Sequence, residues 1–455
     1  MIAIQKYLLK TSLIGLCWGV LFFSQAGHAE TLREAMSAAL QYHPSVDAAT
    51  AMRQGLQDKK VEEWAAKFPE INVTATGGRV YGDNATSRGL AVTRGSGYSY
   101  LWEGTAGLSQ KIFDGFETSE RIAAAEDRLR SADLEVVDVR ENLALQTARA
   151  YFDVMRSKEA LDMVAAHNKQ IEDYRERIAM MVDEGVADQA ELKLSEDITI
   201  LLDNIYEDYQ SQYLAAQAMY QQLTGYRPSG QMDLPEWDHS HFPSSLEEAS
   251  DVLATHPAMK AADYQINASA HDVEAEKAGF YPDVNGELFF LKKDLDDVIG
   301  GEVTDARAVV KLNWNFSTGG AQYAKIRQRQ AGKFEMEARK RELERQLAQA
   351  LEQAWIEYET AGRMADNMQR RREINQELFE TNKTQFDGGQ IRLLQLMQSE
   401  NQYFQTRLEY INARYREQLS ELSVLAALGG LQKTMEVDVP DVEYIYKSPF
   451  RFDDD

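Results

Sequence analysis

The chain has 455 residues, with 49 Lys and Arg against 73 Asp and Glu, and a net charge of −24. This surplus of negative charge excludes a protein that binds nucleic acid by neutralising phosphates. Hydrophobic residues make up 44% of the chain and charged residues 27%, so the chain can bury a core and is not compositionally disordered. A mean hydropathy of −0.48 excludes a bundle of membrane-spanning helices.

One strongly apolar run, Thr11–Phe23, lies near the N-terminus, after two lysines and before a stretch of small residues that ends at Ala29. The run is too short to span a bilayer, so residues 1–29 are expected to be a cleaved secretory signal peptide rather than an uncleaved anchor. The only cysteine, Cys17, lies inside this segment. The mature chain is therefore expected to form no disulfide and to carry no lipid-anchored cysteine.

The rest of the chain contains two copies of one pattern. His43-Pro44 is followed 25 residues later by Pro69, and His256-Pro257 is followed 25 residues later by Pro282. Further along, glycines recur at an offset of 204 residues: Gly115 with Gly319, Gly185 with Gly389, and Gly225 with Gly429. We therefore divide the chain after the signal peptide into a first repeat over residues 30–225, a connector over 226–256, a second repeat over 257–430 and an acidic tail over 431–455.

Each copy is predicted to begin with a helix of about 25 residues and to continue as two strands. The helices are Pro44–Phe68 and Pro257–Tyr281, with proline in the first turn, where it is tolerated. Alternating apolar and polar residues predict strands over Glu70–Val80, Gly104–Phe113, Asp283–Lys293 and Ala306–Phe316. The segments Tyr81–Glu103 and Lys292–Asp305 are expected to be exposed loops, the first of them long.

Two long proline-free segments follow the strands. They predict helices over Glu120–Asp183 and Ala324–Asp387, each about 96 Å long at 1.5 Å per residue. Turns at Gly185 and Gly389, where glycine permits positive φ, lead into helices over Ala187–Thr224 and Ile391–Leu428. The two shorter helices of each copy together match the long one in length, so we expect one long rod beside two half-length rods stacked end to end, packed through heptad stripes.

The four strands have the length that a tilted strand needs to cross a bilayer, with one apolar and one polar face. Four strands cannot close a barrel, and an open edge cannot lie in hydrocarbon, so several copies must contribute to one barrel. Tyr98, Tyr100, Trp102 and Trp314 are placed to line bilayer interfaces. The alternative is a soluble β-sandwich that rests on the helices.

The duplicated order of helix, strand, loop, strand, very long helix, glycine turn and helix resembles the TolC family of outer-membrane export ducts. The resemblance covers about residues 31–430 and is carried by Phe68-Pro69, Phe113-Asp114-Gly115, Ser317-Thr318-Gly319-Gly320 and the two glycine turns. It implies a mainly helical homotrimer with a 12-stranded β-barrel in the outer membrane and a 12-helix tunnel through the periplasm. Its implied partners are outer-membrane lipid, a periplasmic adaptor protein and an inner-membrane ABC transporter or proton-driven pump.

Within that family, four segments are more similar to the branch that serves type I protein secretion than to the lipid-anchored drug-efflux branch: His43-Pro44, Tyr151-Phe152, the run from Arg177 to Gly185, and His256-Pro257. The resemblance therefore implies a duct for type I secretion. Multidrug or small-molecule efflux is the alternative, and a periplasmic coiled-coil scaffold is a further one. No phosphate-binding loop, zinc-protease motif or nucleophile elbow is found, so neither an enzyme nor a cofactor or metal site is expected.

The resemblance also assigns roles to single residues. The adaptor is expected to dock at the turns formed by Gly185, Val186, Gly388 and Gly389, and the chain to pass between helix and strand at Pro69, Gly115, Pro282 and Gly319.

A periplasmic gate is expected beside the turns. Asp188 and Glu191 are predicted to share one helical face. The second copy departs from the family, with Gln395 and Gln398 where aspartates are common and Phe386 in the place of a gate tyrosine. Our hypothesis is that Arg392 pairs with Glu191 or Asp188 across neighbouring hairpins and keeps the tip closed.

Overall fold

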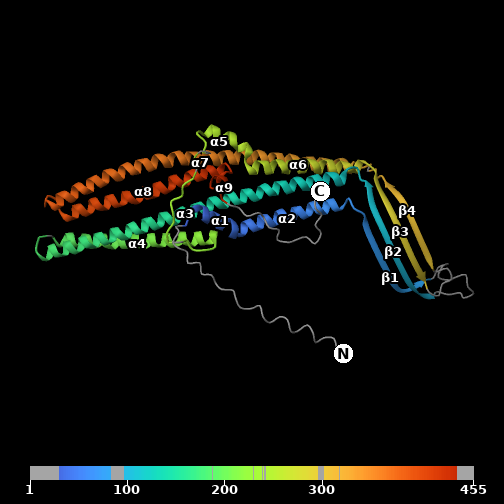
Figure 1. Ribbon diagram of the computed structural model, residues 1–455, viewed down its shortest axis with the longest axis horizontal. Helices are drawn as coiled ribbons and strands as arrows, with labels where there is room; N and C mark the ends of the chain where they lie inside the picture. Colours follow the sequence, from blue (N-terminus) through green and yellow to red (C-terminus); the bar gives the residue numbers. More distant parts are fainter. Residues whose placement is uncertain are drawn as a thin grey trace, which may run out of the picture.

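A computed structural model gives the fold of the chain and describes residues 30–82, 97–186, 188–228, 230–237, 239, 242–295, 302–316 and 318–437. Helices form a long, thin layer, and a four-stranded sheet projects from one end of it (Figure 1). In the described part of the chain, no helix is both long and apolar enough to cross a membrane. The predicted signal peptide lies outside the described residues.

The helices follow the predicted repeat. The first copy contains α1 (Leu32–Tyr42), α2 (Pro44–Ala65), α3 (Glu117–Asp183) and α4 (Gln189–Thr224). After the short α5 (Leu246–Val252), the second copy contains α6 (Pro257–Lys277), α7 (Ala321–Asp387) and α8 (Leu393–Ala427), and α9 (Leu431–Thr434) follows. The two long helices α3 and α7 have 67 residues each. They begin three residues earlier than predicted. Helices α2 and α6 end before the predicted Phe68 and Tyr281, and α6 is followed by a 3-10 turn over Ala278–Phe280.

The two His-Pro pairs start their helices in the same way. His43 is the N-cap of α2, and its side chain accepts a hydrogen bond from the backbone N–H of Ser45. His256 caps α6 and accepts from the N–H of Ala258. Each side chain satisfies a backbone donor that has no partner inside the helix, and the proline that follows has no N–H to satisfy.

The shorter helices lie end to end beside the long ones, as predicted. Both α2 and α4 pack along α3, and both α6 and α8 pack along α7 (Figure 1). At each junction a glycine with positive φ lets the two ends meet: a Cβ on Gly225 would lie 2.8 Å from the Tyr42 ring, and one on Gly429 would lie 2.8 Å from Pro257. No larger residue fits at these two positions without moving its neighbour.

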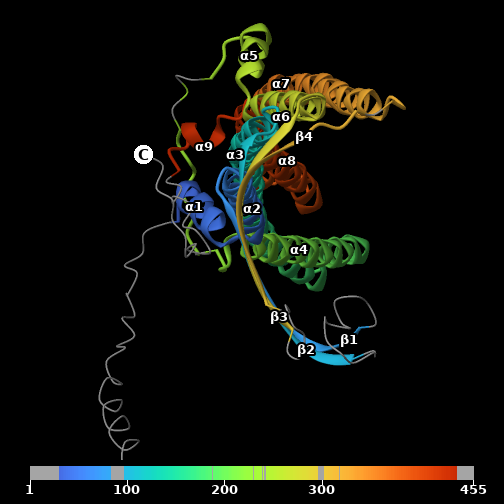
Figure 2. The ribbon, with the colours of Figure 1, turned by 90° about the vertical axis from the view of Figure 1, so that its right-hand side faces the viewer.

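The start of the first repeat, the connector and the start of the tail are hydrogen-bonded to α3. The hydroxyl of Tyr151 is buried and donates to the carbonyl oxygens of Glu30 and Asp233, at 2.7 and 2.6 Å. The carboxylate of Glu141 accepts from the N–H groups of Leu431 and Gln432, at the start of α9. The first residues of the predicted acidic tail are therefore folded, and α1, α5 and α9 lie on the convex side of the curved helical layer (Figure 2).

The sheet is an antiparallel meander in the order β1 (Glu70–Gly82), β2 (Gly97–Phe113), β3 (Asp283–Leu295) and β4 (Val303–Asn313). Pro69 and Pro282 each stand directly before a strand. The outer edges of β1 and β4 have no neighbouring strand among the described residues.

Two strand predictions were wrong. Both ends of the predicted loop Tyr81–Glu103 are strand, because β1 runs to Gly82 and pairs there with Gly97; aromatic residues at alternate positions continue the pleat of β2. The remaining loop residues, 83–96 and 296–301, lie outside the described part. At the other end β4 stops at Asn313, which pairs with Asp283, because Pro282 has no N–H to extend the ladder.

The helix–strand junctions of the two copies also differ. In the first copy Gly115 and Phe116 both have positive φ, and Phe116 is the N-cap of α3. In the second copy the left-handed N-cap of α7 is Gly320, whereas the predicted Gly319 does not have positive φ. Only the first junction is tightly packed, since a Cβ on Gly115 would lie 2.8 Å from the Cβ of Tyr281.

We expect Gly115→Ala to lower the thermal unfolding midpoint measured by circular dichroism. An alanine with left-handed φ costs roughly 1–2 kcal/mol, and the close approach to Tyr281 adds to that cost. Gly319→Ala is the matched control, because a Cβ there has no atom within 4 Å. Equal midpoints for the two variants would contradict the role of the Gly115 junction.

Candidate functional site

One face of the sheet is apolar along most of its length. Residues that pair across antiparallel strands point to the same face, so the register places Ile71 beside Leu108 and Val73 beside Ala106. The side chains of Ile71 and Val73 are 68% and 76% exposed. The apolar face extends over the other strands through Leu288, Phe290, Ala306, Ala308, Val310 and Leu312.

The opposite face is polar and carries charges in pairs. Glu103 lies 3.3 Å from Lys293, and Glu287 lies 3.6 Å from Lys311. Thr74 and Thr105 pair on the same face, and the Arg307 guanidinium lies over the Phe289 ring, 4.5 Å from its centroid. One face of the sheet therefore suits hydrocarbon and the other suits water.

Exposed aromatic side chains lie at both ends of the apolar face. Tyr100 and Trp102 are exposed on β2, at the end far from the helices. Trp314 and Phe316 are exposed next to the helices, with ring centroids 4.8 Å apart. Of the aromatic residues singled out in the sequence, Tyr100, Trp102 and Trp314 thus lie at the two ends where a bilayer protein places them.

The ends of the two hairpins use one turn geometry. Gly185 and Gly389 have φ of +75° and +67°. The N–H of Val186 donates to the carbonyl of Met181, and the N–H of Gln390 donates to that of Gln385, both at 2.8 Å. This is the six-residue closure of a helix C-terminus for which glycine is preferred.

The other docking residues predicted from the sequence are also at the tips. Val186 is exposed. Gly388 caps α7 with φ of −81°. The turns therefore present glycine backbone and the apolar side chain of Val186 to solvent.

Of the predicted gate residues, the structure brings together Glu191 and Arg392. A guanidinium nitrogen of Arg392 donates to Glu191 Oε1 at 3.0 Å, linking α4 to the N-cap of α8. The Arg392 side chain is 83% exposed and that of Glu191 16%. The pair is thus at the surface of the tip, where it holds the two hairpins of one chain together.

The remaining gate residues lie apart from this pair. Asp188 is not on the helical face predicted for it: it is the extended N-cap of α4, and its carboxylate accepts from the N–H of Ala190. Gln395 and Gln398 are exposed on α8. Phe386 packs against the buried cluster between the hairpins.

Sequence reasoning missed a buried polar pair in this cluster. His167 on α3 and Glu400 on α8 have side chains that are about 5% exposed, with Nδ1 4.0 Å from Oε1, and the His167 ring stacks on Phe404 at 3.9 Å. Burial raises the pKa of Glu400 to about 7 and lowers the pKa of His167 to about 4. In sequence, each residue is a single polar position in an apolar stripe, and nothing in the spacing links the two.

Several groups around this pair oppose those shifts. On α3, Tyr174 hydrogen-bonds to Glu400 and favours its charged form, as do the charges of Lys383 on α7 and Arg407 on α8. Asn401 hydrogen-bonds to His167 and favours its protonated form. Desolvation is nevertheless the largest cause of both shifts.

We expect the contact of α3 with α8 to be most stable between pH of about 4 and 7. The raised pKa of Glu400 means that its contribution to stability is lost as pH rises through about 7, and the lowered pKa of His167 means that its contribution is lost as pH falls through about 4. Hydrogen–deuterium exchange of α8, corrected for intrinsic rates, should show less protection at pH ~8 than at ~6.

Glu400→Gln should abolish the loss of protection at high pH, because the amide cannot ionise. Glu409→Gln is the control, since Glu409 is an exposed glutamate on the same helix, paired with Arg371. An unchanged pH dependence in Glu400→Gln would contradict the assignment.

Comparison with known proteins places these features in a family. The sequence model described as outer membrane efflux protein matches residues 35–225 and 249–430. The outer membrane efflux protein BepC of Brucella suis biovar 1 is 28% identical over 356 residues, which cover 75% of this chain and 73% of BepC. The outer membrane protein TolC of Vibrio cholerae is 26% identical over 159 residues, 34% of each chain.

Solved structures share the fold. The Campylobacter jejuni CmeC outer membrane channel superposes with a TM-score of 0.77 at 15% identity, covering 88% of this chain and 86% of CmeC. VceC of Vibrio cholerae gives 0.73 at 18% identity, covering 88% and 96%. The resemblance to TolC and the mainly helical, duplicated fold with a four-stranded sheet are thereby confirmed. Since the family match takes in both repeats, the chain belongs to the outer membrane efflux protein family and is an outer-membrane transport protein, not an enzyme.

Proposed function

We propose that three copies of this chain form one duct, a 12-stranded barrel in the outer membrane continued by a helical tunnel in the periplasm, through which an inner-membrane pump exports its cargo. The observation that carries the proposal is the four-stranded sheet with one apolar face and two edge strands that have no neighbouring strand in the described part of the chain. Edge N–H and C=O groups cannot remain unpaired in hydrocarbon, and pairing β4 of one copy with β1 of the next closes the barrel.

The helical layer has two lateral edges that support the same ring. One edge is formed by α2 and α4, which pack on α3, and the other by α7, which packs on α6 and α8. The helices of both edges carry exposed apolar side chains: Met52 on α2 and Ile200 on α4, and Phe334 and Ile374 on α7. A neighbouring copy would cover these side chains at the same time as it completes the sheet.

The hairpin tips are proposed as the docking site of a periplasmic adaptor, at Gly185, Val186, Gly388 and Gly389. The tips are the ends of the molecule farthest from the sheet (Figure 1). Glycine in an exposed turn lets a partner approach the main chain closely, and the exposed Val186 offers an apolar contact beside it. The adaptor would connect the duct to an ABC transporter or a proton-driven pump.

Two classes of cargo are considered for this duct. The sequence features around His43-Pro44, Tyr151-Phe152 and His256-Pro257 favour type I protein secretion. The names of the family and of BepC favour efflux.

Deleting the gene and complementing it in the same host decides between the two cargo classes. Loss of one or a few large proteins from the culture medium, with unchanged susceptibility to drugs, would support type I secretion. Increased susceptibility with an unchanged set of secreted proteins would support efflux. A deletion strain with neither change would contradict both.

A charge on the apolar face should block insertion, whereas a charge on the polar face should not. Val73→Lys and Thr74→Lys change neighbouring residues of β1 that point to opposite faces. Lysine on a lipid-facing strand position costs ~2–4 kcal/mol near the bilayer midplane. The measurement is the amount of heat-modifiable oligomer in the outer-membrane fraction; equal amounts for the two variants would contradict the proposed orientation of the sheet.

We expect Arg392→Glu to open the tip, because it replaces the ion pair with Glu191 by a repulsion. One such pair is worth only about 0–1 kcal/mol, but three copies act on one aperture. Single-channel conductance in planar bilayers should rise, and cells should become sensitive to bulky antibiotics.

The double variant Glu191→Arg with Arg392→Glu should restore the conductance of the unmodified channel. Lys193→Glu is the control, because Lys193 pairs within α4, with Glu196. Unchanged conductance in a correctly assembled Arg392→Glu oligomer would remove this residue from the gate.

A further inference from the structure

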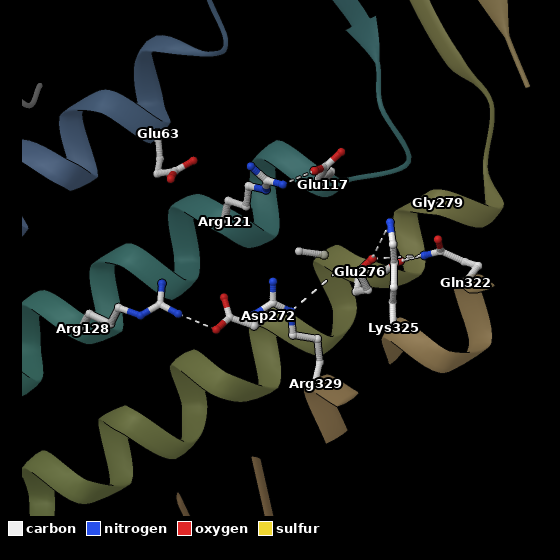
Figure 3. Close-up of a pocket in the computed structure, with 11 residues that line it drawn as sticks. Glu63, Glu117, Arg121, Arg128, Asp272, Glu276, Gly279, Gln322, Lys325 and Arg329 are labelled. Atoms are coloured by element: carbon white, nitrogen blue, oxygen red, sulfur yellow. Dashed lines mark hydrogen bonds and ion pairs between the residues drawn. The ribbon is translucent and has the colours of Figure 1, made fainter. Parts of the chain in front are cut away.

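A polar cavity of about 530 Å³ lies where the helices meet the sheet. It is formed by side chains from α2, α3, α6 and α7 (Figure 3). Four basic and four acidic side chains line it: Arg121, Arg128, Lys325, Arg329, Glu63, Glu117, Asp272 and Glu276. The gate, the docking turns and the apolar sheet face do not include any of these residues.

Most of these charges are closely paired. Arg128 hydrogen-bonds to Asp272, and Arg121 lies 2.5 Å from Glu117. Glu63 is 3.1 Å from Lys59, outside the cavity. The pairs Arg128–Asp272 and Arg121–Glu117 are each neutral. Glu63 shares Lys59 with Glu62, which lies 2.9 Å from the same ammonium group, so the α2 side has one carboxylate in excess.

The α7 side has one cation in excess. Lys325 Nζ lies 3.9 Å from Glu276, and Arg329 Nε lies 3.6 Å from the same carboxylate. Both distances exceed hydrogen-bond length, and both basic side chains are more than half exposed. Two cations thus share one carboxylate and keep N–H donors directed to solvent, one helical turn apart.

Figure 3 views the cavity from the concave side of the helical layer. In Figure 3, the helices beneath the strands follow one another from left to right as α2, α3, α6 and α7. The helices have this order when the layer is viewed from the side opposite α1, α5 and α9 (Figures 1 and 2). In the proposed ring this side faces the lumen, just below the barrel. Three copies would bring three such pairs of cations to one cross-section of the duct.

We propose that Lys325 and Arg329 form an anion-binding site in the lumen at the junction of tunnel and barrel, which holds a carboxylate or phosphate group of a solute in transit. The inference rests on the proposed duct. A guanidinium and an ammonium group one turn apart offer a planar donor fork and a point charge, the combination that binds carboxylate and phosphate oxygens. Glu276 competes with the bound anion for the same two cations.

Current block in planar bilayers tests the site in the full-length assembled protein. Citrate and inorganic phosphate, added separately, should each reduce the single-channel current, and the more strongly blocking anion identifies the preferred group. Lys325→Glu with Arg329→Glu should raise the apparent dissociation constant of the block by at least about tenfold, which corresponds to ~1.4 kcal/mol. Glu276→Gln should lower it, because the competing carboxylate is removed.

The charge-preserving variant Lys325→Arg with Arg329→Lys is the matched control and should be blocked as the unmodified channel is. Arg33→Glu is a second control, because it changes the charge on α1, on the convex side. If the charge-reversal variant is blocked as strongly as the unmodified channel, the inference is overturned. The same holds if the charge-preserving variant loses the block as fully as the charge-reversal variant does. Neither result affects the proposed function. A chain that forms no pore overturns the proposed function and this inference with it.

Discussion

The fold depends on backbone hydrogen bonding at the two edges of a four-stranded sheet. The N–H and C=O groups on the outer sides of β1 and β4 have no neighbouring strand among the described residues, and one sheet face exposes side chains such as Val73 and Leu312. In water these edges would recruit other strands, and in hydrocarbon they could not exist unpaired. Joining copies edge to edge satisfies both the hydrogen bonds and the apolar face, so the assembly is a condition of the fold rather than an addition to it.

The two repeats of one chain contribute differently to the helical layer. Although α3 and α7 have equal lengths, α3 buries many more side chains, because it packs against α2, α4, α6 and α8. Helix α7 has neighbours on fewer sides and leaves Phe334 and Ile374 exposed. Two repeats with one ancestral pattern have thus become a central helix and an edge helix, and the edge helix is the one on which the next copy would pack.

The repeated features were readable because each depends on local chemistry. The proline at the first position of α2 and α6 and the glycines of the tip turns follow from backbone conformations that few residues adopt. The length match of the helices follows from their residue counts at a fixed rise per residue. The start of β2 depends on its pairing with β1, so composition alone misplaced it. The positive φ of Gly320 and the capping role of Asp188 are local features, and the sequence prediction assigned them wrongly. The pairing of His167 with Glu400 joins helices more than 200 residues apart in sequence, and no spacing rule predicts it.

Charge is distributed unevenly along the molecule in a way that the net value of −24 conceals. At the tip, the first repeat supplies Glu191 and the second supplies Arg392, so the proposed ring of three chains would alternate acidic and basic hairpins around one aperture. Alternation of this kind needs two repeats that differ, since six identical hairpins would place like charges beside one another. In the proposed ring, duplication followed by divergence would place attractive rather than repulsive charges on neighbouring hairpins.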